Sequence, residues 1–258
     1  MAAELSLMAV PDFPLVRAGD DLGELLLSRL AAVSTIGAAL RDGDVLVFAQ
    51  KIVSKAEGRC VRLADVSVSQ RAQALAAQVG KDPRLVQLIL SESRRVVRAA
   101  KDVLIVEHRL GFVLANAGID QSNVASAAEG DSALLLPLDP DASAERLRAT
   151  LVARSGCRLG VIISDSFGRP WRVGTVGVAI GVAGWAAVMD LRGHSDLFGR
   201  QLRVTVVGHA DEIAAAASLL MGQAAEGRPI VRVRGLAVPA GASDSRALLR
   251  APSQDLFR

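Results

Sequence analysis

The spacing of apolar residues along the chain predicts several helices. Leucines recur three and four residues apart after Asp20, which can serve as the N-cap of that helix. Pro83 suits the first turn of another helix, which is predicted to continue to about Arg98. Further predicted helices cover residues 69–79, 143–153 and 211–225.

Short apolar runs between these helices indicate buried strands. Residues 103–107 and 112–115 flank a tight turn at Gly111, a pattern typical of an antiparallel pair. Because strands and helices do not alternate strictly, the pattern favours an α+β fold of mixed, largely antiparallel sheets with packed helices. The remaining predicted strands cover residues 45–49, 159–164, 202–207 and 230–233, and residues 116–131 and 165–172 are predicted loops.

Residues 173–189 carry no charge and include four glycines. The stretch is shorter than the about 20 apolar residues that cross a bilayer, so it predicts buried strand and tight turns. We find no basic and apolar leader at the N-terminus and expect a soluble, cytoplasmic protein without membrane contact. The glycines also permit close approach between two chains. From Pro239 onward the sequence is polar and predicts a loosely held tail.

Composition narrows the possible functions. The 258 residues have a net charge of +3, and 51% are hydrophobic, which indicates a folded globular protein. Aromatic residues make up 3% and tyrosine is absent, which argues against a nucleic-acid-binding protein. The two cysteines, Cys60 and Cys157, predict free, buried thiols. The three isolated histidines predict surface or packing positions: His108, His194 and His209.

Common catalytic and phosphate-binding motifs are absent from the sequence. There is no G-x-x-x-x-G-K-[ST], G-x-G-x-x-G, G-x-S-x-G or H-E-x-x-H pattern. Residues 222–228 come nearest to a phosphate loop, but they follow a predicted helix and end in Arg228 before a proline. Any chemistry must therefore come from other polar segments.

Residues 49–59 form the first such segment. Gln50, Lys51 and Lys55 follow a predicted buried strand, and lysine is a mobile point charge suited to phosphate oxygens. A solvated turn after the strand explains this segment equally well. Residues 190–200 mix both charges with glycine, as either a binding loop or plain surface would.

Two further segments offer oxygen ligands for a hard cation. Asp120 and Asn123 lie on a loop of small residues, although an Asx-rich turn would have the same composition. Asp165 and Ser166 follow a predicted buried strand and precede two arginines. Carboxylate and hydroxyl oxygens suit Mg²⁺ or Mn²⁺ together with nucleotide phosphates. Taken together, these segments indicate metal-assisted phosphate chemistry without a standard phosphate loop.

At these segments the sequence resembles the coenzyme F420-0:L-glutamate ligases, also called γ-glutamyl ligases. The resemblance runs in order across nearly the whole chain, through DFPLV (12–16), AGDDL (18–22), DGDVLVFAQKIVSKAEGR (42–59), ANAGIDQSNV (115–124), LLLPLDPDASAERLR (134–148), GVIISDSFGRPWRVGTVGVAIGVAG (160–184), DLFGRQLRVTV (196–206), ADEIAAAASLLMGQAAEG (210–227) and VRGL (233–236).

The resemblance implies a γ-glutamyl ligase-like fold with two intimately associated subdomains, in a domain covering residues 1–240 with a tail at 241–258. It implies a ligase that uses GTP to phosphorylate the terminal carboxylate of coenzyme F420-0. The amine of L-glutamate then attacks the acyl phosphate, and further glutamates are added through γ-linkages. Mg²⁺ or Mn²⁺ assists, with K⁺ as a helper, and the protein is expected to be a homodimer that buries more than about 2,000 Å².

Matching the family's motifs assigns a role to individual residues. Asp120, Asp165 and Lys55 are implied to be catalytic. The implied metal ligands are Asp120, Asp165, Ser166 and Gln223. The implied GTP contacts are Phe13, Pro14, Leu15, Val16, Gln50, Lys51, Lys55 and Asn123.

Two alternatives to this activity stay open. A non-catalytic nucleotide- or anion-binding protein could retain the same fold and the same polar segments. A ligase acting on another carboxylate acceptor is the second alternative, because the sequence does not reveal the acceptor pocket.

Overall fold

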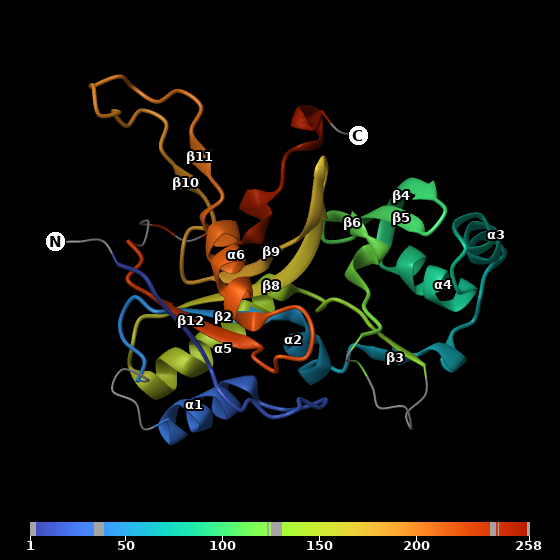
Figure 1. The fold of residues 1–258 in the computed structure, drawn as a ribbon, viewed down its shortest axis with the longest axis horizontal. Helices are drawn as coiled ribbons and strands as arrows, with labels where there is room; N and C mark the ends of the chain where they lie inside the picture. Colours follow the sequence, from blue (N-terminus) through green and yellow to red (C-terminus); the bar gives the residue numbers. More distant parts are fainter. Residues whose placement is uncertain are drawn as a thin grey trace.

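A computed structural model describes residues 4–33, 39–122, 124, 131–237, 241 and 243–256. Its centre is a five-stranded sheet in the order β1-β12-β2-β8-β9 (Figure 1). Strands β2 and β8 are parallel, whereas the other neighbours are antiparallel. The strands of this sheet are β1 (Ser6–Ala9), β2 (Val45–Ala49), β8 (Gly160–Arg169), β9 (Arg172–Ala183) and β12 (Ile230–Arg234).

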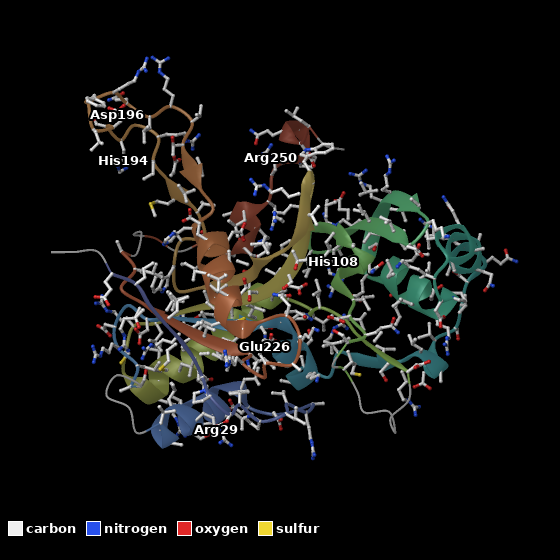
Figure 2. The ribbon with its side chains drawn as sticks, viewed as in Figure 1. Arg29, His108, His194, Asp196, Glu226 and Arg250 are labelled. Atoms are coloured by element: carbon white, nitrogen blue, oxygen red, sulfur yellow. The ribbon has the colours of Figure 1, made fainter. Side chains whose placement is uncertain are left out.

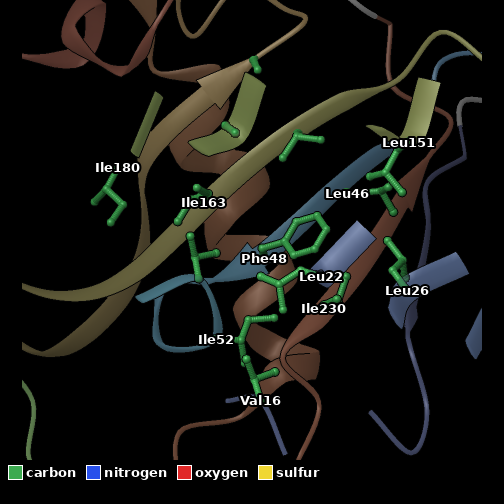
Figure 3. Close-up of a cluster of buried hydrophobic side chains, with 14 of the residues drawn as sticks. Val16, Leu22, Leu26, Leu46, Phe48, Ile52, Leu151, Ile163, Ile180 and Ile230 are labelled. Atoms are coloured by element: carbon green, nitrogen blue, oxygen red, sulfur yellow. The ribbon is translucent and has the colours of Figure 1, made fainter. Parts of the chain in front are cut away.

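Helices cover both faces of the central sheet. In β2, Leu46 and Phe48 face one core, and Val45 and Val47 face the other, as expected for a strand buried on both sides. Figure 3 shows Leu46 near Leu26 of α1, with Phe48 in the same buried cluster. Helices α1 (Leu22–Ala32) and α5 (Pro140–Ser155) pack on this first face, and α6 (His209–Met221) packs on the second.

Two glycines of β9 allow these helices to approach the sheet closely. A Cβ atom on Gly177 would lie 2.5 Å from the carbonyl oxygen of Ala214 in α6. A Cβ atom on Gly181 would lie 2.3 Å from the carbonyl oxygen of Pro140 at the start of α5. The buried part of the uncharged stretch is therefore accounted for by packing within the chain.

A smaller α+β unit with its own hydrophobic core is inserted between β2 and β8. Its helices confirm two predicted boundaries: Ser69 caps α3, and Gly80 ends that helix with positive φ. Helix α2 (Gln50–Ala56), which follows β2, packs instead on the first face of the central sheet through Ile52 and Val53. The elements of the inserted unit are β3 (Cys60–Arg62), η1 (Leu63–Asp65), α3 (Gln70–Val79), α4 (Pro83–Ser91), β4 (Ser93–Ala100), β5 (Val103–His108), β6 (Val113–Ala115), η2 (Asn116–Gly118) and β7 (Ser132–Leu134). Strands β4, β5 and β6 form one antiparallel sheet, and β3 pairs with β7 in another.

Several sequence predictions in this half of the chain are wrong in detail. The helix that begins at Pro83 ends at Ser91, and the residues up to Ala100 form β4, because they pair with β5. Asp21, rather than Asp20, caps α1 through the N–H groups of residues 23 and 24. Both cysteines are free, as predicted, but neither is buried: Cys60 is exposed and Cys157 is half-buried.

Two hairpins project from the central body (Figure 1). The first is the far end of β8 and β9, where the predicted loop at 165–172 is wrong because β8 continues through Arg169 and pairs with β9. The second lies between β10 (Met189–Asp190) and β11 (Val206–Val207), and Figure 2 shows His194 and Asp196 on it. The predicted strand at 202–207 is thereby reduced to two residues.

The segment Ser243–Leu249 is bound to the body, so the prediction of a loosely held tail is wrong there. Ser245 is 2% exposed, and its N–H and hydroxyl both donate to the carboxylate of Asp141 in α5. Two 3-10 helices, η4 (Ser245–Leu248) and η5 (Pro252–Gln254), lie in this C-terminal region. Over the part of the chain described here, no helix combines the length and apolar character needed to cross a membrane.

Candidate active site

The parallel pair β2–β8 brings two polar segments to one end of the sheet. Ala49, the last residue of β2, pairs with Ser164 of β8. Helix α2 begins directly after Ala49, and Asp165 directly follows Ser164. Because parallel strands run in the same direction, Lys51 and Asp165 emerge at the same end of the sheet.

A cavity of about 400 Å³ opens at this end of the sheet. Its volume lies within the range of small-molecule sites. Most of the residues assigned by resemblance line it: Phe13, Pro14, Leu15, Val16, Gln50, Lys51, Lys55, Asp165, Ser166 and Gln223. Asn123 lies outside the described residues.

Asp120 reaches the cavity through an ion pair with Lys51. The Lys51 Nζ atom lies 2.6 Å from Asp120 Oδ2, and it also donates to the hydroxyl of Ser122 at 2.8 Å. The other oxygen of Asp120 accepts the N–H of Ser122 at 2.7 Å. Asp120 and Leu134 each donate a backbone N–H to the other's carbonyl oxygen, and these two hydrogen bonds hold the Asp120 loop in place.

The two aspartates have pKa values shifted in opposite directions. Burial, followed by the charge of Asp120, raises the pKa of Asp165 to about 7, although the N–H of Ser166 and the charge of Lys51 oppose this shift. Burial would also raise the pKa of Asp120, but the Lys51 ammonium and Ser122 outweigh it and lower that pKa. Burial therefore decides the direction of the pKa shift at Asp165, whereas the direct contacts with Lys51 and Ser122 decide it at Asp120.

Ser166 and Gln223 meet in the cavity although they are far apart in the sequence. The Ser166 hydroxyl donates to Gln223 Oε1 at 2.9 Å. Helix α6 ends at Met221, and Gly222 with positive φ turns the chain toward Ser166.

The whole segment 221–229 lines the cavity, a role that the sequence reasoning missed except for Gln223. Figure 2 shows Glu226 on this segment. Its two glycines, Gly222 and Gly227, were the available signal, but the motif test required a strand before them and a helix stands there instead.

The side chains at the cavity form a donor set for a hard cation. Asp120 and Asp165 supply carboxylate oxygens, and Ser166 and Gln223 supply a hydroxyl and an amide oxygen, the types that Mg²⁺ and Mn²⁺ prefer. No three acidic, histidine or cysteine side chains gather into a metal cluster within the described residues. The set therefore fits a cation that shares its remaining positions with water and phosphate oxygens.

Gln50 contributes to the cavity wall with limited side-chain access. The residue is 2% exposed, and its amide donates to the hydroxyl of Ser54 at 2.7 Å.

A second cavity of about 680 Å³ adjoins Ile180 and Val182 of β9. None of the predicted site residues that the structure describes lines it, and neither do the three histidines. The chemistry-bearing residues therefore point to the smaller cavity.

Comparison with known proteins assigns the family. Residues 12–235 match the sequence profile of F420-0:gamma-glutamyl ligase. The chain belongs to the F420-0:gamma-glutamyl ligase family.

Curated relatives of this family align over almost the entire chain. The coenzyme F420:L-glutamate ligase of Methanothermobacter thermautotrophicus is 48% identical over 98% of this chain and 99% of its own length. The proteins of the same name from Archaeoglobus fulgidus and Methanocaldococcus jannaschii are 46% and 42% identical, each over 96% of this chain and 94% of their own length. The ligase family and the α+β fold expected from the sequence are both confirmed.

Proposed function

We propose that this protein is a GTP-dependent ligase that joins L-glutamate to coenzyme F420-0 and extends a γ-linked glutamate tail. Mg²⁺ or Mn²⁺, with K⁺ as a helper, would assist the reaction. The observation that carries the proposal is the cavity at the end of β2 and β8, in a member of this ligase family. Lys51, Lys55 and Asp165 line the cavity, and Asp120 is ion-paired with Lys51. Cationic side chains and a bound cation are the usual means of neutralising a transferring phosphoryl group.

The proposed reaction has two steps. In the first, an oxygen of the acceptor carboxylate attacks the γ-phosphorus of GTP, and the bond to the β-phosphate oxygen breaks to give an acyl phosphate and GDP. In the second, the glutamate amine attacks the acyl carbon, the carbon–oxygen bond to phosphate breaks, and the amine loses a proton. The products are an amide, inorganic phosphate and GDP.

In this proposal, some cavity residues bind the negatively charged phosphates and others bind the divalent cation. Lys51 and Lys55 would hold phosphate oxygens, since lysine binds phosphate as a point charge. Asp120, Asp165, Ser166 and Gln223 would hold the divalent cation, which when bound would supply charge neutralisation at the phosphates. The Phe13–Val16 segment would form a wall beside the nucleotide.

The decisive experiment combines purified protein with F420-0, L-glutamate, GTP and Mn²⁺. Mass spectrometry should show the acceptor gaining glutamate residues, and GDP should appear only when both acceptor and glutamate are present. Asp165→Asn should fold but form no product, and wild-type rates for this variant would remove Asp165 from the mechanism. If the protein binds GTP but forms no product, the non-catalytic nucleotide-binding alternative is favoured. If product forms with another carboxylate acceptor and not with F420-0, the protein is a ligase for that acceptor.

We also propose that the protein acts as a homodimer. Both projecting hairpins carry apolar side chains that are almost fully exposed: Trp171 and Val173 on the first, and Leu197 and Phe198 on the second. Exposed apolar groups of this kind are typical of protein interfaces.

Sedimentation at micromolar concentration tests the assembly. Wild-type protein should sediment as a dimer, and Phe198→Asp should shift it toward monomer with loss of activity. A fully active wild-type monomer would refute the proposal.

A further inference from the structure

Lys51 and a divalent cation require the same carboxylate. The Lys51 ammonium lies 2.6 Å from Asp120 Oδ2, and the N–H of Ser122 donates a hydrogen bond to Asp120 Oδ1. A cation that approaches either oxygen of Asp120 therefore meets a fixed positive charge or must compete with a hydrogen bond. Like charges at such short range repel, most strongly where water is partly excluded, and both side chains here are 33% exposed.

The Lys51 ammonium group could also lie in the cavity, away from Asp120. It stands on the first turn of α2 and lines the same cavity as Lys55 and the 221–229 segment. Four methylene groups let the ammonium move by several ångströms through changes in rotamer. An ammonium released from Asp120 can therefore reach an anionic group bound in that cavity without any movement of the backbone.

We propose that Lys51 is a built-in counter-ion of Asp120 that a divalent cation displaces, and that its displacement couples cation binding to phosphate binding in the cavity. Lys51 is thus a positioning residue that keeps the carboxylate neutralised before the cation arrives. This inference rests on the proposed function in taking Asp120 as a ligand of the divalent cation and a nucleotide phosphate as the anion. By linkage, the cation and the phosphate would each strengthen the binding of the other.

The first test measures Mn²⁺ binding without nucleotide, by electron paramagnetic resonance of free Mn²⁺. Lys51→Met removes the competing charge and should bind Mn²⁺ roughly three- to tenfold more tightly than the wild type. Lys51→Arg keeps the charge and should bind close to the wild-type level. Lys101→Met is the matched control, because Lys101 lies in the exposed turn between β4 and β5, and it should leave the affinity unchanged.

The second test measures GDP affinity with and without saturating Mn²⁺ in the same variants. Mn²⁺ should strengthen GDP binding by a smaller factor in Lys51→Met than in the wild type. Because Mn²⁺ also binds GDP in solution equally in every sample, the difference between variants reports the protein's contribution.

Two outcomes would overturn the inference. One is Mn²⁺ affinity in Lys51→Met that equals or falls below the wild-type value, and the other is an unchanged Mn²⁺ effect on GDP. Either result could occur in a protein that still forms the glutamate product, so failure of this inference is distinguishable from failure of the proposed function. Absence of Mn²⁺ binding in both the wild type and Lys51→Met would overturn this inference together with the proposed metal site.

Discussion

Glu92, at the end of α4, is the centre of a buried charge cluster in the inserted unit. Its Oε2 atom lies 2.9 Å from Arg59 Nη2, 3.1 Å from Arg109 Nε and 3.5 Å from His108 Nε2. Its side chain is only 11% exposed. We predict that Glu92→Gln, which removes the charge and keeps the shape, destabilises the protein.

The pKa of Glu92 sets the size of this effect. Burial alone would raise it, but the close approach of the His108 ring and the charges of Arg59 and Arg109 outweigh burial and lower the pKa from 4.5 to about 2. At about 1.4 kcal/mol per pH unit, this difference corresponds to about 3 kcal/mol of folding free energy. Since the folded-state pKa is lowered, the stabilisation is present above pH 4.5 and is lost as the pH falls toward about 2.

Urea unfolding followed by circular dichroism measures this effect. At pH 7, Glu92→Gln should reduce the free energy of unfolding by about 2–3 kcal/mol, and the difference from the wild type should shrink below pH 4.5. Glu145→Gln is the control, because Glu145 pairs with Arg148 at the surface and such pairs contribute about 1 kcal/mol or less. A Glu92→Gln variant within 1 kcal/mol of the wild type at pH 7, or a difference that persists unchanged at pH 2, would refute the reasoning.

Further predictions concern the cavity and its walls. Lys55→Ala should weaken GTP binding by about 1.5–3 kcal/mol in calorimetry and Lys55→Arg should restore it partly, whereas unchanged affinity would favour the solvated-turn interpretation. Gly177→Ala should destabilise the protein by about 1–3 kcal/mol in urea unfolding, because its Cβ would collide with Ala214, while Gly168→Ala, which meets nothing within 4 Å, should not. Because the pKa of Asp165 is raised to about 7, stability of the protein without added metal should fall as the pH rises from about 4 to 7, and a pH scan of Asp165→Asn should lack this fall.

The sequence predicted correctly the helix ends that depend on contacts between residues close together in the chain. Ser69 and Gly80 fixed the ends of α3 because a cap and a left-handed glycine act within one turn. The residues after Ser91 were predicted as helix and form β4 instead. The spacing of apolar residues does not reveal that these residues pair with β5, although the adjacent β-branched residues Val96 and Val97 favour a strand.

The candidate site was predictable residue by residue but not as an arrangement. Polar residues at strand ends led to Lys51, which follows β2 in the first turn of α2, and to Asp165 of β8, and β2 and β8 turn out to be parallel neighbours. The contact between Ser166 and Gln223 spans 57 positions, and only the packing of α6 against β9 creates it. A sequence read without homologues contains no local signal for such a contact.

The inserted unit and the cavity are connected through the backbone around β7. Arg59, which is held by Glu92, donates through Nε to the carbonyl oxygen of Leu136 at 2.9 Å. Two residues earlier, Leu134 exchanges both backbone hydrogen bonds with Asp120. The charge cluster therefore fixes the strand against which the Asp120 loop is anchored. Loss of Glu92 should consequently loosen the ion pair between Asp120 and Lys51 as well as the fold, because both depend on the position of this strand.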